Sequence, residues 1–292
     1  AGFAHYFGDD VPNWPPYVWI EDDRAHAVPS ATMVRDAKNG VSAGPMTPGW
    51  SLEAVLPELT RRCVSFIRDR ATANEPFFLY FPMTSPHTPI NPSEAFAGQS
   101  GVSRYADFLL ETDWSVGQVL RALDQYDVAK NTLVVFTTDN GPSPKADFPR
   151  LAAGGVDLRG HWRGHKADIW EGGHRVPFIA RWPGKIPAGR VDKTSIFSAV
   201  DLLPTFCEIA GVDLPATYKP DGISQVATLR GTGNPLREKP LFWKSPAPWP
   251  ARKGKPDHWV SYVVASQNWK LVANRDAGYV ELYDLLADPL EK

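Results

Sequence analysis

The chain has 292 residues, 43% of them hydrophobic and 12% aromatic, which is enough for one large folded domain or for one such domain with a small second one. Its 31 basic and 33 acidic residues give a net charge of −2 without a long run of either sign, which argues against nucleic-acid or membrane-surface partners. No apolar stretch approaches the roughly 20 residues that a membrane span requires.

Apolar periodicity predicts alternating helices and strands in the first two thirds of the chain. Residues 1–50 are rich in proline, glycine and aromatic residues and predict extended loop. Helical spacing of apolar residues predicts helices at 51–70, 103–126 and 195–211, with Ser51 as a cap and Gly211 as an end. Short apolar runs predict buried strands at 76–83, 133–136 and 176–184. This alternation is typical of an α/β domain.

After about residue 216 the pattern changes. A proline-rich aromatic connection, "WKSPAPWPARKGKPDHW" at 243–259, leads into the short alternating runs "WVSYVVAS", "WKLVANR" and "YVELYDL". Alternation between turn residues is typical of antiparallel strands. The sequence therefore predicts an α/β domain over 1–215 and a small antiparallel subdomain over 216–292.

The two cysteines, Cys63 and Cys207, both lie in apolar, helix-like surroundings. We expect buried free thiols rather than a disulfide or a metal pair. The redox compartment is left open by this pattern.

The stretch "LVVFTTDNGP" at 133–142 places two threonines and then an acid and an amide after a predicted strand. Four apolar residues without alternation suit a parallel strand covered on both faces, so Asp139 and Asn140 are expected at its carboxyl end, where open α/β sheets bind ligands. Carboxylate and amide oxygens are hard donors that suit calcium or magnesium. The alternative is an Asx turn that ends the strand.

A second polar loop, "MTSPHTPINP" at 83–92, follows the strand predicted at 76–83. Pro86 and Pro89 stiffen this loop around His87, which can donate a proton or bind an anion. The alternative is an ordinary surface histidine.

A third loop, at 160–184, concentrates positive charge around glycines just before another predicted strand. Its basic residues are His161, Arg163, His165, Lys166, His174 and Arg175. Hard oxygen donors, a histidine and a lysine at one sheet edge suggest a tetrahedral oxyanion ester, a sulfate or a phosphate, as the ligand. The alternative is a solvated basic loop.

Five motifs, in this order, resemble the formylglycine-dependent sulfatases, which are arylsulfatase-like members of the alkaline-phosphatase superfamily. They are "FFLYFPMTSPHTP", "LVVFTTDNGP", "KADIWEGGHRVPFIARWPG", "DLLPTFCEIAG" and "ELYDLLADPLEK". The resemblance implies an alkaline-phosphatase-like α/β sandwich with a mostly parallel central sheet, incomplete here, and a small C-terminal antiparallel sheet. It also implies hydrolysis of aryl or carbohydrate sulfate esters.

The resemblance assigns roles to particular residues. Asp139 and Asn140 match ligands of the family's calcium ion, which is expected in preference to magnesium. Lys166 matches the lysine that contacts the sulfate. His87 matches the histidine that contacts the sulfate ester and protonates the leaving oxygen. Glu171 and the glycines after it match the scaffold of their motif rather than its chemistry.

The chain also departs from the family pattern. It lacks the family's amino-terminal Asp-Asp pair and the Cys-x-Pro-Ser-Arg motif whose cysteine becomes formylglycine, since Cys63 begins "CVSFI" and Cys207 begins "CEIAG". We interpret the chain as about the carboxyl-terminal two thirds of a sulfatase, with its partner, the amino-terminal part of the same protein, supplying the formylglycine. Alone it is expected to be inactive.

Two other functions remain open from the residues. One is a phosphatase or phosphodiesterase of the same superfamily, whose metal site would want more histidine and aspartate ligands than these motifs offer. The other is a catalytically inactive remnant that binds sulfated glycans. By family resemblance, a secreted or periplasmic location is expected.

Overall fold

The computed structural model describes residues 2–10, 13–244, 262–274 and 278–292. The chain forms two compact units, which we call unit 1 (residues 1–129 and 145–156) and unit 2 (residues 130–144 and 157–292). Each unit is described by itself.

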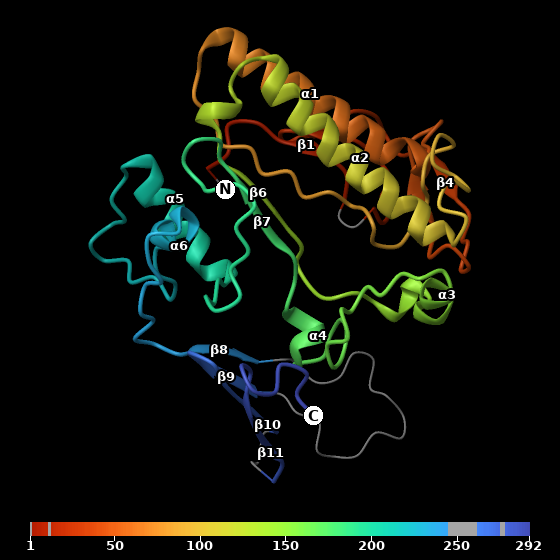
Figure 1. The fold of residues 1–292 in the computed structure, drawn as a ribbon. Helices are drawn as coiled ribbons and strands as arrows, with labels where there is room; N and C mark the ends of the chain where they lie inside the picture. Colours follow the sequence, from red (N-terminus) through yellow and green to blue (C-terminus); the bar gives the residue numbers. More distant parts are fainter. Residues whose placement is uncertain (1, 11–12, 245–261, 275–277) are drawn as a thin grey trace. The chain divides into compact units, whose positions relative to one another are not determined.

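Unit 1 combines two long helices with small antiparallel strand groups (Figure 1). Its strands pair in the order β1-β2-β3 and β4-β5. Its elements are β1 (Phe7–Gly8), β2 (Ile20–Glu21), β3 (Arg24–Ala25), β4 (Ala31–Met33), β5 (Gly44–Met46), η1 (Leu52–Ala54), α1 (Val55–Ala73), α2 (Arg104–Gln125), η3 (Pro144–Ala146, which begins in unit 2) and α3 (Phe148–Ala153).

Helices α1 and α2 confirm the two helices predicted at 51–70 and 103–126, and they lie side by side (Figure 1). Ser103 caps α2, because its side chain accepts a hydrogen bond from the Ala106 amide at 3.1 Å. Ser51 makes no such cap. The buried hydroxyls of Thr60 and Ser115 share a hydrogen bond of 2.6 Å between the two helices. The contact satisfies polar groups that would otherwise be costly to bury.

Unit 2 contains a two-stranded sheet, short helices and a four-stranded antiparallel sheet. Residues 129–131 form η2, which crosses from unit 1. The other elements are β6 (Val134–Thr137), α4 (Glu171–His174), β7 (Phe178–Arg181), η4 (Ala199–Asp201), α5 (Leu202–Ala210), α6 (Val226–Arg230), β8 (Leu241–Lys244), β9 (Tyr262–Ser266), β10 (Trp269–Ala273) and β11 (Val280–Asp284).

The predicted strands at 133–136 and 176–184 correspond to β6 and β7, but they pair antiparallel rather than in a parallel sheet, with Val134 opposite Arg181. β6 is also only half-buried. An apolar run of four residues suits a covered strand in either direction, so the sequence pattern could not fix the pairing.

The strand predicted at 76–83 is wrong: among the described residues, no paired strand includes this segment. The segment is not buried on both faces either, because Phe78 and Tyr80 are 61% and 67% exposed while Phe77 packs edge-on against Phe66 of α1. An apolar run becomes a strand only where another strand accepts its hydrogen bonds.

The C-terminal antiparallel sheet is confirmed, with strand order β11-β10-β9-β8. Its three predicted strands are β9, β10 and β11, and β8 joins them at the edge. Alternation along β9 and β10 turns Val263 and Val272 inward, where they form a core with Ile169 and Tyr283. Most of the connection predicted at 243–259 lies outside the described residues.

The helix predicted at 195–211 begins later, at η4, and continues as α5. Ser198 and Asp201 form a reciprocal capping box that fixes this start. Gly211 ends α5 in the left-handed conformation, as predicted.

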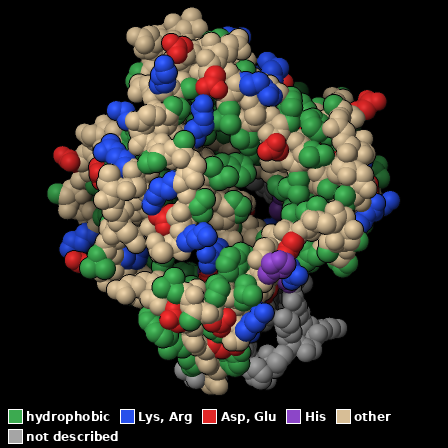
Figure 2. Space-filling view, viewed as in Figure 1, with side chains coloured by type: hydrophobic (Ala, Val, Ile, Leu, Met, Phe, Trp, Pro, Cys, Tyr) green, Lys and Arg blue, Asp and Glu red, His purple; other side chains and the backbone are tan. Residues whose placement is uncertain are grey.

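The two cysteines are free thiols, as predicted: Cys63 is buried and Cys207 is half-buried. Acidic and basic side chains are interspersed on the face shown in Figure 2. In the part of the chain that the structure describes, no helix is both long and apolar enough to cross a bilayer.

Candidate active site

Asp139 and Asn140 lie just beyond the end of β6, after Thr138, as the sequence predicted. Asp139 is exposed, and its Oδ1 accepts a hydrogen bond from the Thr138 hydroxyl at 3.3 Å. No backbone amide among the described residues donates to its carboxylate, so the Asx turn centred on Asp139 is not found. The Asn140 side-chain NH₂ donates to the Gly141 carbonyl at 2.9 Å, which leaves its amide oxygen for another partner.

Gly141 brings this loop against the loop of residues 163–173, which is itself tightly folded at Gly172 and Gly173. The Gly141 amide donates to the Gly173 carbonyl at 2.8 Å. A Cβ at Gly141 would lie 1.9 Å from the Gly172 carbonyl oxygen, and one at Gly173 would lie 2.0 Å from the Asp168 carbonyl oxygen. Only glycine permits backbones to approach this closely.

Lys166 lies on the second of these loops. Its backbone amide donates to the Pro142 carbonyl at 2.9 Å, and the loop is closed by a hydrogen bond of 2.7 Å from the Gly172 amide to the Arg163 carbonyl. The Lys166 side chain is half-buried, and its ammonium has no carboxylate partner among the described residues. The structure therefore brings the backbones that carry Lys166, Asp139 and Asn140 together in unit 2.

The basic cluster predicted over 160–184 is largely committed to carboxylates instead of being free for an anion. Arg163 pairs with Glu281 at 3.3 Å and donates to the Tyr283 hydroxyl at 2.7 Å. Arg175 pairs with Glu171 at 3.1 Å. Their charges are balanced by acidic residues that lie far away in sequence or inside the motif, which a local count of charges cannot reveal.

A buried charged cluster, which the sequence analysis did not predict, connects α4 with β10 and Glu291. The Lys270 ammonium donates to Glu171 at 2.9 Å, forms an ion pair with Glu291 at 2.7 Å, and lies 3.0 Å from Nε2 of His174. Strand alternation does contain a signal for it, because Lys270 is on the same face of β10 as the buried Val272.

This cluster sets the protonation of its members. Burial and the nearby Lys270 ammonium lower the pKa of His174 to about 4, so the ring is neutral at neutral pH. Its Nε2 also lies 2.9 Å from the Ile169 carbonyl, and it can satisfy only one of these two partners at a time. Burial alone would raise the pKa of Glu171, but the charges of Lys270 and Arg175 hold it below its usual value.

His87 lies in unit 1, in a loop that is fixed to α2 by a hydrogen bond of 2.9 Å between the hydroxyls of Ser85 and Thr112. Its Nδ1 is 2.7 Å from the Thr88 carbonyl oxygen, which can only accept. Nδ1 therefore carries a proton, and Nε2 is the nitrogen that can exchange a proton with a ligand. The convergence of His87 with the unit 2 residues stays a prediction.

Asp139 and Asn140 fit calcium by their chemistry, since both offer hard oxygen atoms. They supply only part of the six to eight oxygen ligands that calcium takes. No group of three or more histidine, cysteine, aspartate or glutamate side chains suited to a metal occurs within the described ranges. The pair would therefore supply only part of a calcium site.

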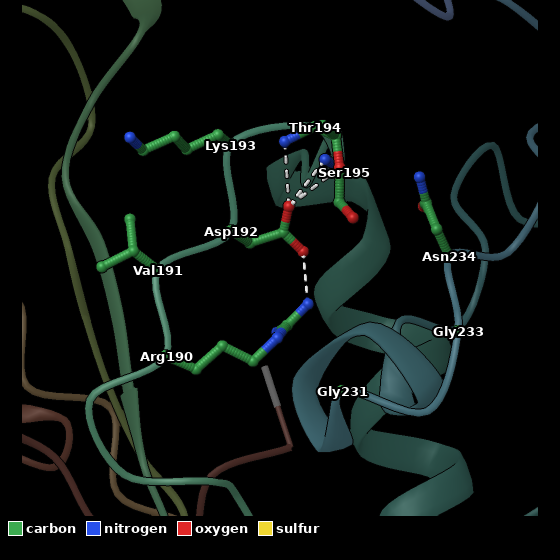
Figure 3. Close-up of a pocket in the computed structure, with 9 residues that line it drawn as sticks. All are labelled: Arg190, Val191, Asp192, Lys193, Thr194, Ser195, Gly231, Gly233 and Asn234. Atoms are coloured by element: carbon green, nitrogen blue, oxygen red, sulfur yellow. Dashed lines mark hydrogen bonds and ion pairs between the residues drawn. The ribbon is translucent and has the colours of Figure 1, made fainter.

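A surface depression of about 430 Å³ in unit 2 contains none of the predicted site residues; it is lined by residues 190–195 with Gly231, Gly233 and Asn234 (Figure 3). Arg190 donates to Asp192 at 2.6 Å and to the Thr228 carbonyl at 2.7 Å. Asp192 also accepts from the Thr194 and Ser195 amides at 3.0 and 2.9 Å. The Arg190 and Asp192 side chains therefore stabilise the conformation of the loop that lines the depression.

A sequence model of the sulfatase family matches residues 42–212, and a model described as the C-terminal part of N-sulphoglucosamine sulphohydrolase matches residues 161–292. The chain belongs to the sulfatase family. The family matches cover the loops of Asp139, Asn140, Lys166 and His87, and so confirm the resemblance seen in the motifs.

Several curated sulfatases are similar to this chain. An N-acetylgalactosamine-6-O-sulfatase of Bacteroides thetaiotaomicron is 32% identical over 87% of this chain and 51% of its own length. An N-acetylgalactosamine-6-sulfatase of Canis lupus familiaris is 33% identical over 83% of this chain and 44% of its own length. Arylsulfatase A of Bos taurus is 36% identical over 69% of this chain and 39% of its own length. The chain thus spans about half the length of the curated relatives that it matches most fully.

Solved structures of sulfatases share the fold. A structure described under glycosaminoglycan metabolism by Bacteroides thetaiotaomicron has a TM-score of 0.76 and 25% identity, covering all of this chain (100%) and 68% of that one. A sulfatase from Pseudoalteromonas sp. has a TM-score of 0.70 and 23% identity, covering 94% of this chain and 52% of that one. The chain described here has the predicted alkaline-phosphatase-like α/β fold with an antiparallel C-terminal sheet.

We predict that Gly141→Ala in the full-length protein separates the two loops, because the added Cβ would overlap the Gly172 carbonyl. Turnover of a sulfate ester should fall about 100-fold, the scale on which small misplacements of reacting groups act. Gly233→Ala, where a Cβ meets only Ala227 at 3.9 Å, is the matched control. Equal turnover in both variants would contradict the role of the glycine contact.

We also predict an acid-sensitive contribution of His174 to stability. Its folded pKa of about 4 lies below the usual value, so the unfolded chain binds more protons between about pH 6.5 and pH 4. Stability should therefore fall as pH drops through this window. Urea unfolding at pH 7 and pH 4.5 should show a smaller pH-dependent loss for His174→Asn than for the parent, and a parent-like loss for the exposed His161→Asn. The same loss in all three proteins would exclude the effect.

Proposed function

We propose that the complete protein hydrolyses sulfate esters of carbohydrates, with calcium and a formylglycine that lies outside this chain. The observation that carries the proposal is the hydrogen bond of 2.9 Å from the Lys166 amide to the Pro142 carbonyl. It holds the backbone of Lys166 against the loop that carries two hard oxygen donors, and a cationic and a metal-binding side chain on adjacent loops suit an anionic tetrahedral ester. Membership of the sulfatase family selects sulfate over phosphate.

A hexosamine 6-sulfate is the proposed substrate class. Two relatives that match more than four fifths of this chain, from a bacterium and a mammal, are named as N-acetylgalactosamine-6-sulfatases. Another solved sulfatase fold holds D-glucosamine-2-N,6-O-disulfate as its substrate. Amino sugars with a 6-sulfate are therefore the first compounds to test, and aryl sulfates serve as generic substrates. A secreted or periplasmic location is part of the same proposal.

Each residue has a separate task in this proposal. The Lys166 ammonium binds the sulfate oxygens and stabilises the charge that they carry in the transition state. Asp139 and Asn140 would hold calcium, which would add positive charge at the same oxygens. The formylglycine supplies the attacking hydroxyl group when it is present.

His87 is proposed as the general acid. Because Nδ1 donates to the Thr88 carbonyl, the proton for the leaving oxygen must come from Nε2 of a doubly protonated ring. After transfer the ring is neutral and keeps the Nδ1 proton. A poor leaving group, such as a sugar hydroxyl, needs this proton, whereas a nitrophenolate departs without it.

The phosphatase alternative is tested by a matched pair of substrates. The full-length protein, expressed so that the family's cysteine is converted to formylglycine, should hydrolyse N-acetylgalactosamine 6-sulfate and nitrophenyl sulfate. Calcium chelation should abolish this activity if Asp139 and Asn140 hold the ion. A clear preference for the corresponding phosphate esters would overturn the proposal, and a lack of any hydrolysis would favour the glycan-binding remnant.

Variants of Lys166 and His87 should separate by substrate. Lys166→Ala should lower turnover of every sulfate ester by about 100-fold or more, since a preorganised charge partner is lost. His87→Ala should reduce turnover of the sugar sulfate more than that of nitrophenyl sulfate. Lys185→Ala, an exposed lysine elsewhere in unit 2, serves as a control. Equal losses for His87→Ala on the two substrates would remove the general-acid role.

A further inference from the structure

Lys270 is a fully buried cation on β10, with an exposed fraction of 0%. Its partners come from two directions: Glu171 and His174 belong to α4, whereas Glu291 follows β11. A buried ammonium is tolerated only when such partners replace water. Lys270 thus joins the C-terminal sheet to the segment that begins directly after the Lys166 loop.

Glu291 also forms hydrogen bonds of its own with this part of the chain. It is fully buried (0% exposed), and its Oε2 accepts a hydrogen bond of 2.6 Å from the backbone amide of Glu171. Its backbone carbonyl accepts another, of 3.0 Å, from the Arg163 guanidinium. Glu291 therefore contacts both Arg163 and Glu171. These two residues are the ends of the part of the loop, residues 163–171, that carries Lys166.

Glu281 of β11 adds a third connection at these two ends. It pairs with Arg163 at 3.3 Å and accepts a hydrogen bond of 3.0 Å from the Trp170 indole N–H. The Arg163 guanidinium lies over the Trp170 ring, 4.0 Å from its centroid. The two ends of the loop are therefore clamped to each other and to β11.

We propose that Lys270, Glu281 and Glu291 are positioning residues that hold loop 163–171 so that Lys166 stays against Pro142. Among the described residues no hydrogen bond or ion pair joins them to the Lys166 side chain, so they act by fixing both ends of the loop that presents it. The catalytic consequence rests on the proposed sulfatase function, whereas the effect on the loop does not.

A cluster that only added global stability would behave differently. It would lower the stability of unit 2 as a whole while the loop of the folded molecules kept its contacts. A positioning cluster instead sets the free energy of opening the loop, which amide exchange measures locally. The Lys166 amide is a direct reporter, because it donates the backbone hydrogen bond to the Pro142 carbonyl that joins the two loops.

The test is hydrogen exchange of the full-length protein carrying Glu291→Gln, which keeps the side chain's size and removes its charge. Exchange at Lys166 should become roughly tenfold faster or more, while the amides paired between β6 and β7, which belong to the same unit, keep their rates. Glu238→Gln, an exposed glutamate of unit 2, should change neither. If Glu291→Gln fails to fold, Glu281→Gln, which removes a less buried carboxylate, should give the same local acceleration.

An unchanged exchange rate at Lys166 in a folded variant would overturn the proposal, whether or not the parent protein hydrolyses sulfate esters. If the parent is active, the same variant should lower kcat about tenfold and change KM less, since misplaced catalytic groups cost rate. Normal kcat in a variant with accelerated exchange would contradict the catalytic part. A parent without activity would count against the proposed function and leave the exchange result to decide the positioning role.

Discussion

The close approach of two loop backbones is the constraint on which the unit 2 site depends. The Gly141 amide lies 2.8 Å from the Gly173 carbonyl oxygen, and no side chain fits at Gly141, Gly172 or Gly173 without overlapping a carbonyl. This contact is what puts Lys166 beside the loop of Asp139 and Asn140. The glycines therefore determine the geometry of a site whose chemistry is carried by other residues.

The charged cluster of Lys270, Glu171 and Glu291 is buried on the same face of β10 as the apolar core residue Val272. Removing one member of such a cluster leaves a buried charge without a partner, which is far more costly than the cluster is stabilising. The contacts of the cluster are therefore expected to form or break together. Such a cluster can hold a loop in one position, because a state with only some of the contacts formed is disfavoured. The proposed positioning role would give the small C-terminal sheet a part in the site, although the sheet carries none of the proposed catalytic groups.

The sequence predicted the parts of the molecule that depend on local pattern, namely the helices α1 and α2, the strands of the C-terminal sheet and the position of Asp139 at a strand end. It failed where the outcome depends on distant residues. The segment 76–83 forms no paired strand, and β6 and β7 pair antiparallel, because an apolar run encodes neither its partner nor its direction. Arg163 was predicted among the residues that bind an anion, but it pairs with Glu281, which lies more than a hundred residues away in the sequence.

The most direct test of this account is a crystal structure of the full-length protein with calcium and a sulfated sugar that is not turned over. We expect calcium on the oxygens of Asp139 and Asn140, and the sulfate within hydrogen-bonding distance of both the Lys166 ammonium and Nε2 of His87. A sulfate bound away from Lys166, or His87 more than about 10 Å from it, beyond the scale of one ligand pocket, would contradict the account.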